Sequence, residues 1–161
     1  LEAVEARNAL QKRVLVQKVF RVLGEDLTGI KIAVWGLSFK PETDDMREAS
    51  SLVFIQEMLR AGAKIVAYDP VAKESAKRIL PEGYFSSGRL NIVDNQYAVL
   101  EGAEILVILT EWKSFLYPDL ELIKEKLKQK VIIDGRNIYD PEEMRRAGFL
   151  YSGIGRGASL A

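Results

Sequence analysis

The chain contains neither cysteine nor histidine, and these absences exclude several kinds of chemistry. Without cysteine it has no disulfide framework, no thiolate metal site and no thiol nucleophile. Ser38 and Thr43 would need an adjacent general base to act as nucleophiles, and no such base is evident in the sequence. We therefore expect neither a catalytic residue nor a metal site in this chain.

Long apolar runs and an excess of one charge are also lacking. No run approaches the roughly 18 apolar residues of a transmembrane helix, and no signal peptide is recognisable. The 23 basic residues balance the 23 acidic ones, which disfavours nucleic acid or a membrane surface as a partner. The length of 161 residues suits one domain with a substantial core. We expect a soluble, cytoplasmic protein.

A long helix is predicted at the start of the chain. Apolar residues recur with helical spacing from about Glu2 to Leu23, and Gly24 marks the expected end. Leu1 is not an initiator methionine and no capping residue precedes the helix, so we expect the chain to begin inside a longer helix. The wide apolar stripe has two interpretations: packing on its own domain, or packing against a second subunit.

After this helix the pattern alternates between strands and helices. Strands are predicted near Lys31–Trp35, Lys64–Tyr68, Glu104–Leu109 and Val131–Asp134, with weaker ones at Asn91–Val93 and Leu150–Ser152. Helices are predicted near Glu48–Ala61, Val71–Leu80, Gln96–Glu101, Leu120–Leu127 and Pro141–Ala147. Such alternation predicts an α/β fold, a doubly wound, mostly parallel Rossmann-like sheet preceded by the long helix.

Candidate binding residues follow the predicted strand ends. Ligands of doubly wound sheets bind beyond the carboxyl ends of the strands, where side chains from different strands converge. The candidates at these ends are Phe39, Lys40, Arg47, Asp69, Thr110, Glu111 and Arg136.

The segment 32–50 is a strand–loop–helix unit with two cations, Lys40 and Arg47. Its loop is neither G-x-G-x-x-G nor a Walker loop. Lys40 suits a phosphate or ribose oxygen, and the alternative is a solvated lysine. Arg47 stands near a helix start, where the helix dipole disfavours a cation. Two interpretations remain for Arg47: Glu48 offsets its positive charge, or that charge binds an anion. We expect Asp45 to cap the helix.

Arg136 follows Asp134 and Gly135 at the end of an apolar strand. Gly135 lets the backbone approach a ligand closely, and the arginine fork suits a phosphate or a carbonyl edge. The alternative for Arg136 is an ion pair with Asp134 or Asp140. Asp69 occupies the ribose-binding position of a Rossmann fold, but Asp-Pro commonly forms a turn, which we favour.

Four segments resemble the C-terminal, nucleotide-sugar-binding domain of the UDP-glucose 6-dehydrogenase family, which includes GDP-mannose dehydrogenases. They are GLSFKPETDDMREAS (Gly36 to Ser50), AYDP (Ala67 to Pro70), LTEW (Leu109 to Trp112) and DGRNIYDP (Asp134 to Pro141). The resemblance implies that residues 1–24 end a central linker and dimerisation helix, and that residues 29–161 bind a UDP-sugar.

The resemblance also implies roles for individual residues. Phe39 would lie beside the uridine, Lys40 would contact the UDP-sugar, and Arg136 would bind the uridine part. Arg47 would reach across a cleft to NAD, which a missing N-terminal domain would mainly bind. Glu111 and Trp112 are candidates on the resemblance alone, and Arg156 is a weaker anion candidate.

The implied parent reaction converts UDP-glucose, two NAD and water to UDP-glucuronate and two NADH, which supports polysaccharide biosynthesis. Because the family's cysteine and NAD domain are lacking, we interpret the chain as the C-terminal portion of a homodimeric enzyme and expect it to be inactive alone. The alternatives are a family member acting on UDP-N-acetylmannosamine or GDP-mannose, or a non-catalytic α/β assembly module.

Overall fold

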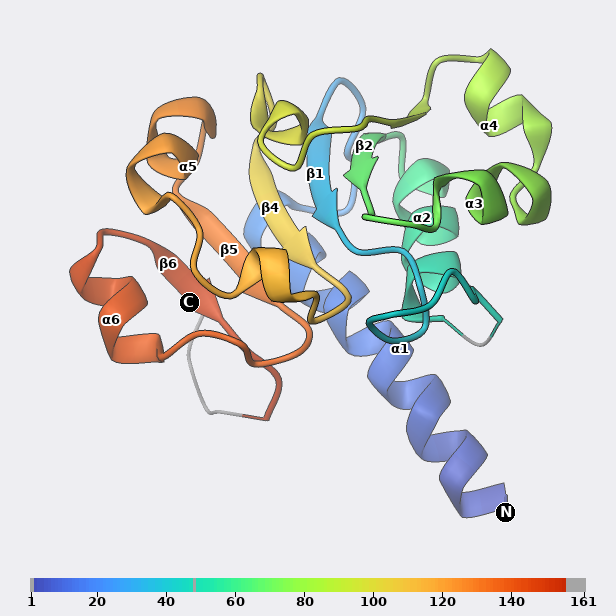
Figure 1. Cartoon of the computed structure of the whole chain (residues 1–161), viewed down its shortest axis with the longest axis horizontal. Coiled ribbons are helices and arrows are strands. Elements are labelled where there is room, and N and C mark those ends of the chain that lie inside the picture. Colours follow the sequence, from blue (N-terminus) through green and yellow to red (C-terminus); the bar gives the residue numbers. More distant parts are fainter. Residues whose placement is uncertain (1, 48, 156–161) are drawn as a thin grey trace.

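A six-stranded parallel sheet forms the centre of the molecule (Figure 1). The structure is a computed structural model that describes residues 2–47 and 49–155, with side chains from Lys12 onward. The strands are β1 (Lys31–Trp35), β2 (Lys64–Tyr68), β3 (Leu90–Ile92), β4 (Ile105–Ile108), β5 (Val131–Asp134) and β6 (Leu150–Ser152). Their order is β3-β2-β1-β4-β5-β6. The chain therefore builds the sheet outward from β1 in one direction and outward from β4 in the other. This confirms the predicted doubly wound fold, and every strand pair is parallel.

Helices cover both faces of the sheet because the strands are apolar on both faces. They are α1 (Glu2–Leu23), α2 (Ser50–Arg60), α3 (Lys73–Ile79), α4 (Glu82–Ser86), η1 (Ala98–Leu100), η2 (Lys113–Phe115), α5 (Leu120–Lys126) and α6 (Pro141–Arg146). Ile32 and Val34 of β1 join a core cluster that includes α1 and α2, whereas Ala33 and Trp35 join the opposite cluster with α5 and α6. The central strands therefore alternate between two hydrophobic cores.

Several predicted helices have different bounds in the structure. The helix predicted at Val71–Leu80 begins only at Lys73, and the segment Gln96–Glu101 forms a single 3-10 turn. The helix predicted at Glu48–Ala61 begins at Ser50, although Glu48 itself lies outside the described residues. The short elements α4 and η2 were not predicted. A few residues of helix carry too little periodicity to stand out in a sequence.

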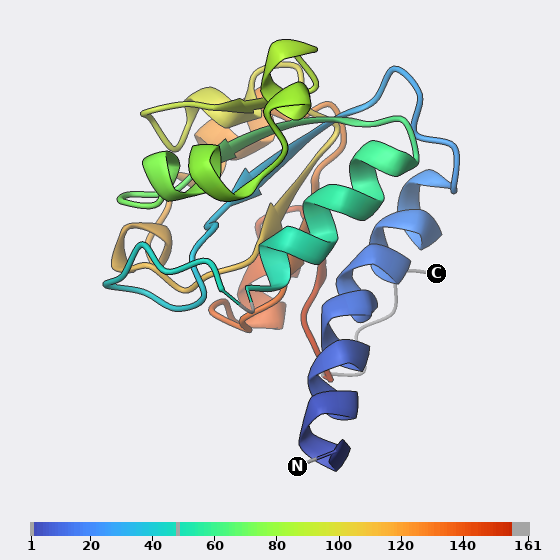
Figure 2. The same ribbon diagram turned by 90° about the vertical axis from the view of Figure 1, so that its right-hand side faces the viewer.

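The second half of α1 packs on its own domain. Leu15, Val16 and Val19 are buried in the core cluster that also contains α2. Figure 2 shows α1 lying beside α2, with its N-terminal end extending beyond the sheet. Packing on its own domain is thus confirmed for this half of the helix. No helix in the described ranges is long and apolar enough to cross a bilayer.

Candidate functional site

The loop after β1, residues 36–40, is held through its backbone by side chains from other segments. We call it the β1 loop. The carbonyl oxygen of Leu37 accepts a hydrogen bond of 2.6 Å from the Ser51 hydroxyl of α2. The carbonyl of Ser38 accepts one of 2.8 Å from Thr110, which follows β4. The loop is therefore fixed from two sides of the sheet's carboxyl edge.

Gly36 makes this arrangement possible. Its φ is +96°, and a Cβ built on it would lie 2.6 Å from Cβ of Thr110. Any other residue would be strained by the backbone angle and would also collide with Thr110. Gly36 thus lets the β1 loop pass close to the end of β4.

The carboxylate of Asp69, at the end of β2, also binds this loop. It accepts hydrogen bonds from Leu37 N at 2.7 Å and Ser38 N at 3.1 Å. It also accepts bonds from Val71 N and Ala72 N, in the turn that precedes α3. The turn interpretation of Asp69 is confirmed, because its acceptor positions are already used.

Arg136 connects the ends of three strands. Its Nε donates to the carbonyl of Leu109 at 3.1 Å, and its Nη2 donates to the carbonyl of Phe39 at 2.8 Å. Its acidic neighbour is Glu111, with 3.8 Å between Nε and Oε1. The alternative of an ion pair with Asp134 or Asp140 is wrong.

Asp134 is fully buried and holds backbone instead. It accepts bonds from the amides of Arg136 and Ile138 and a 2.6 Å bond from the Tyr151 hydroxyl. Asn137 adopts a left-handed φ of 56° and exchanges two hydrogen bonds with the backbone of Ile154. Side-chain hydrogen bonds therefore also hold the loop after β5.

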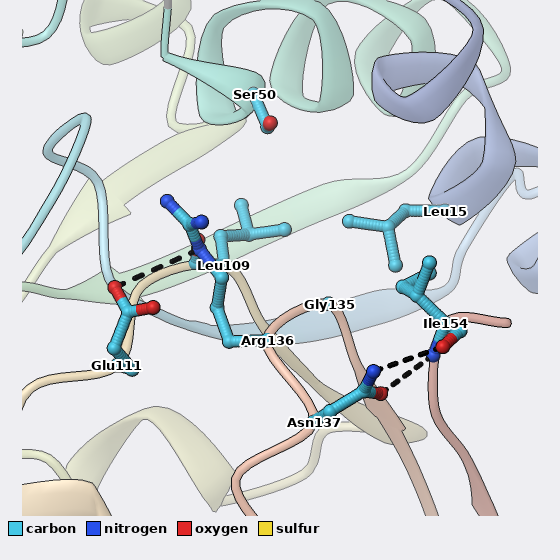
Figure 3. A pocket seen from close by; sticks show the side chains of 8 residues that line it. All are labelled: Leu15, Ser50, Leu109, Glu111, Gly135, Arg136, Asn137 and Ile154. Atoms are coloured by element: carbon cyan, nitrogen blue, oxygen red, sulfur yellow. Dashed lines mark hydrogen bonds and ion pairs between the residues drawn. The ribbon is translucent and has the colours of Figure 1, made fainter. Parts of the chain in front are cut away.

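A pocket of about 270 Å³ lies between these segments (Figure 3). It is lined by Leu15, Ser50, Leu109, Glu111, Gly135, Arg136, Asn137 and Ile154. In Figure 3 the Arg136 side chain lies beside Leu109, and a dashed line joins its Nε to Glu111. The interpretation of Gly135 needs correction: a Cβ there would meet Leu15 at 2.8 Å and the Ile108 carbonyl at 2.9 Å. Leu15 and the carbonyl of Ile108 are thus the groups that approach the Gly135 backbone closely.

Arg136 contacts the backbone carbonyl of Phe39, and the side chains of Phe39 and the next residue, Lys40, are exposed. Phe39 is 46% exposed, so it is not a core residue. Among the described residues, Lys40 forms no ion pair within 4 Å. The loops that carry Phe39, Lys40 and Arg136 therefore meet at the carboxyl edge of the sheet, next to the switch between β1 and β4.

Arg47 lies in a separate hollow. Its guanidinium pairs with Asp45 at 2.9 Å, and this hydrogen bond is the main cause that lowers the pKa of Asp45 to about 2. The expectation that Asp45 caps α2 is wrong, because the N-cap is Ala49 and has no side-chain cap. The hollow, of about 440 Å³, is lined by Thr43, Asp44, Asp45, Met46, Arg47, Ser75, Arg78 and Ile79.

Sequence reasoning missed several contributors to the site. Leu15 lines the pocket from a helix more than 100 residues before Arg136 in the chain, and Ser51 holds the β1 loop from α2. A short polar residue next to a helix start is a weak signal for such a role. Arg156 lies outside the described residues, and these contain no group of three acidic side chains suited to a metal.

Comparison with known proteins shows the family of this chain. The profile of the UDP-glucose/GDP-mannose dehydrogenase family, UDP binding domain, matches residues 33–141. The chain is 45% identical over 156 residues to UDP-glucose 6-dehydrogenase of Pseudomonas aeruginosa, covering 97% of this chain and 34% of that protein. It is 40% identical over 158 residues to UDP-glucose 6-dehydrogenase TuaD of Bacillus subtilis, covering 98% and 33% respectively.

Solved structures show the same similarity. A UDP-glucose dehydrogenase from Pyrobaculum islandicum superposes with a TM-score of 0.75 at 31% identity, covering 94% of this chain and 31% of that one. A UDP-D-ManNAc dehydrogenase from Pyrococcus horikoshii gives a TM-score of 0.68 at 29% identity, covering 96% and 32%. The chain spans about a third of the length of the curated relatives it matches.

The matched region runs from β1 to the first residue of α6. It therefore contains the β1 loop, Asp69, Thr110 and Arg136, which together build the carboxyl edge of the sheet. The chain belongs to the UDP-glucose/GDP-mannose dehydrogenase family and contains that family's UDP-binding domain.

Proposed function

We propose that this chain binds the UDP part of a UDP-sugar at the carboxyl edge of its sheet, as part of an NAD-dependent UDP-glucose 6-dehydrogenase. The observation that supports the proposal is the hydrogen bond from Arg136 to the Phe39 carbonyl, which joins the loops carrying Phe39, Lys40 and Arg136 beside the switch point, within the family's matched region. An exposed ring suits a flat base, and two cations suit a diphosphate.

Arg136 has donors to spare for a ligand. A guanidinium carries five N–H groups, and here two of them bond the carbonyls of Leu109 and Phe39. Those two bonds keep its plane fixed, so the remaining donors are oriented before a ligand arrives. Lys40 supplies a flexible point charge that suits the same ligand.

The parent reaction would oxidise UDP-glucose with two NAD to UDP-glucuronate. This chain would hold the nucleotide so that remote binding energy positions the sugar for chemistry elsewhere. Arg47, in its separate hollow, would face NAD held mainly by another domain. UDP-glucose is favoured over other sugar nucleotides by the 45% identity to a UDP-glucose 6-dehydrogenase.

We also propose that the chain acts in the cytoplasm within a homodimer built through the leading helix, with residues 1–24 as the linker and 29–161 as the binding domain. The N-terminal end of α1 extends beyond the sheet, where a second subunit would meet it (Figure 2). Sedimentation of the chain at increasing concentration tests this: self-association supports it, and a monomer at every concentration contradicts it.

Calorimetric titration with UDP tests the binding site. Lys40→Ala and Arg136→Ala should each weaken binding about tenfold to a hundredfold, because each removes a charge-assisted contact. Arg47→Ala should leave UDP affinity unchanged, as should Lys64→Ala, a control at the opposite end of β2. Wild-type binding that neither of the first two substitutions weakens would refute the site. No binding at millimolar UDP would favour a non-catalytic assembly module.

Addition of UDP-glucose and NAD tests activity. The chain should form no NADH by itself, because it contains no cysteine to carry the covalent step. Reproducible absorbance change from NADH with the pure chain would contradict this.

A further inference from the structure

We propose that Asp69 is a positioning residue for nucleotide binding. Its carboxylate holds the β1 loop in the binding geometry before any ligand arrives, so that Phe39 and Lys40 are presented ready-made. This inference rests on the proposed function, because it concerns the same UDP site.

The carboxylate of Asp69 ties together three segments that surround the switch point. Its Oδ2 accepts bonds from Leu37 N at 2.7 Å, Ser38 N at 3.1 Å and Trp112 Nε1 at 3.3 Å. Its Oδ1 accepts bonds from Val71 N and Ala72 N at 2.9 Å and 2.8 Å. The donors come from the loops after β1, β2 and β4.

Asp69 acts through these groups and does not touch the ligand itself. Its side chain is buried, with the residue only 4% exposed. A carboxylate has about four lone-pair positions, and here five N–H groups already point at it. No acceptor position remains for a ribose hydroxyl.

The charge of Asp69 matters as well as its shape. Every position around a carboxylate is an acceptor, whereas the isosteric Asn carries an NH₂ group on one side. That NH₂ would face either the amides of Leu37 and Ser38 or those of Val71 and Ala72. Asp69→Asn therefore keeps the volume, turns a donor toward one loop and leaves the other loop with only a neutral amide oxygen, so the β1 loop is held more weakly in either orientation.

The rest of the β1 loop is bonded in the same manner. Phe39 N donates to the Asp45 carbonyl at 2.7 Å, and the Phe39 carbonyl accepts from Arg136. A loop fixed in this way loses little conformational freedom on binding, which favours affinity. The loop is thus expected to be ordered without UDP and to change little when UDP binds.

NMR-detected hydrogen exchange at Leu37 and Ser38, combined with UDP titration, tests the inference. In the wild type these amides should exchange slowly, and UDP should change their rates less than about threefold, because the hydrogen bonds already exist. In Asp69→Asn they should exchange about 10- to 100-fold faster and regain protection with UDP, while UDP affinity falls about tenfold. Asp26→Asn, the same substitution at a residue before the other end of β1, should leave both readouts unchanged.

The possible failures are distinguishable. A wild type that does not bind UDP overturns the proposed function, whereas the exchange rates without UDP report on Asp69 alone. Fast wild-type exchange that UDP slows, or wild-type affinity in Asp69→Asn, overturns the inference. Should Asp69→Asn not fold, the wild-type rates decide the matter. Slow exchange at Leu37 and Ser38 without UDP supports the inference, and fast exchange that UDP slows overturns it.

Discussion

The guanidinium of Arg136 donates to the carbonyl oxygen of Phe39 at 2.8 Å, although the two residues are 97 positions apart in the chain. This bond joins the loop after β5 to the loop after β1, across the end of β4. The Arg136 guanidinium and the backbone of the β1 loop are therefore held together. A substitution of Arg136 should therefore alter the position of the β1 loop at Phe39.

Arg136→Lys should bind UDP about tenfold more weakly than the wild type, close to the affinity of Arg136→Ala. Lysine keeps the positive charge but cannot reach two carbonyls and a ligand with a rigid fork. Calorimetric titration of the three proteins decides the matter. Recovery of wild-type affinity by Arg136→Lys would show that charge alone is required.

Gly36→Ala should destabilise the fold by about 2–4 kcal/mol, from the positive φ and the collision with Thr110 together. Gly88→Ala is the matched control, because Gly88 has a φ of +77° but open space around its Cβ position. It should cost about 1–2 kcal/mol. Urea denaturation measures both, and equal losses would contradict the proposed collision.

Leu15→Ala should lower the free energy of unfolding by about 2–5 kcal/mol, because it empties a buried site between α1 and β5. Gln17→Ala, on an exposed position of the same helix, should stay within about 0.5 kcal/mol of the wild type. Similar stabilities for the two variants would mean that this part of α1 does not pack on the sheet in solution.

The Asp45 carboxyl should titrate far below its ordinary value. The hydrogen bond from Arg47 lowers the pKa of Asp45 from 3.8 to about 2. The pair is thus intact above about pH 4 and is lost as the pH falls through about 2. Carbon-detected NMR of the carboxyl group measures this.

In Arg47→Ala the pKa of Asp45 should rise toward its ordinary value of 3.8. Arg78→Ala, in the same hollow, should leave the Asp45 titration unchanged. A low Asp45 pKa that survives in Arg47→Ala would show that another group causes the shift.

The strands were the part of the fold that local sequence could predict. β1, β2, β5 and β6 have the predicted bounds, because short apolar runs between glycines and charged residues mark strands that are buried on both faces. Helix starts were less predictable, as α3 shows. The amides of Val71 and Ala72 bond the Asp69 carboxylate in a turn that precedes α3, and an apolar pattern does not show where such a turn ends and a helix begins.

The sequence by itself determined the order of strands and helices, the parallel sheet, and the presence of Phe39, Lys40 and Arg136 after strand ends. Periodicity and strand alternation are local properties, so they can be read along the chain. Only the tertiary structure decided that Arg136 bonds the Phe39 carbonyl, that Asp69 holds three loops, and that Asp45 pairs with Arg47 and leaves α2 uncapped. Backbone carbonyls and amides are the same in every residue, so which side chain bonds them depends on distances that exist only after the sheet has formed.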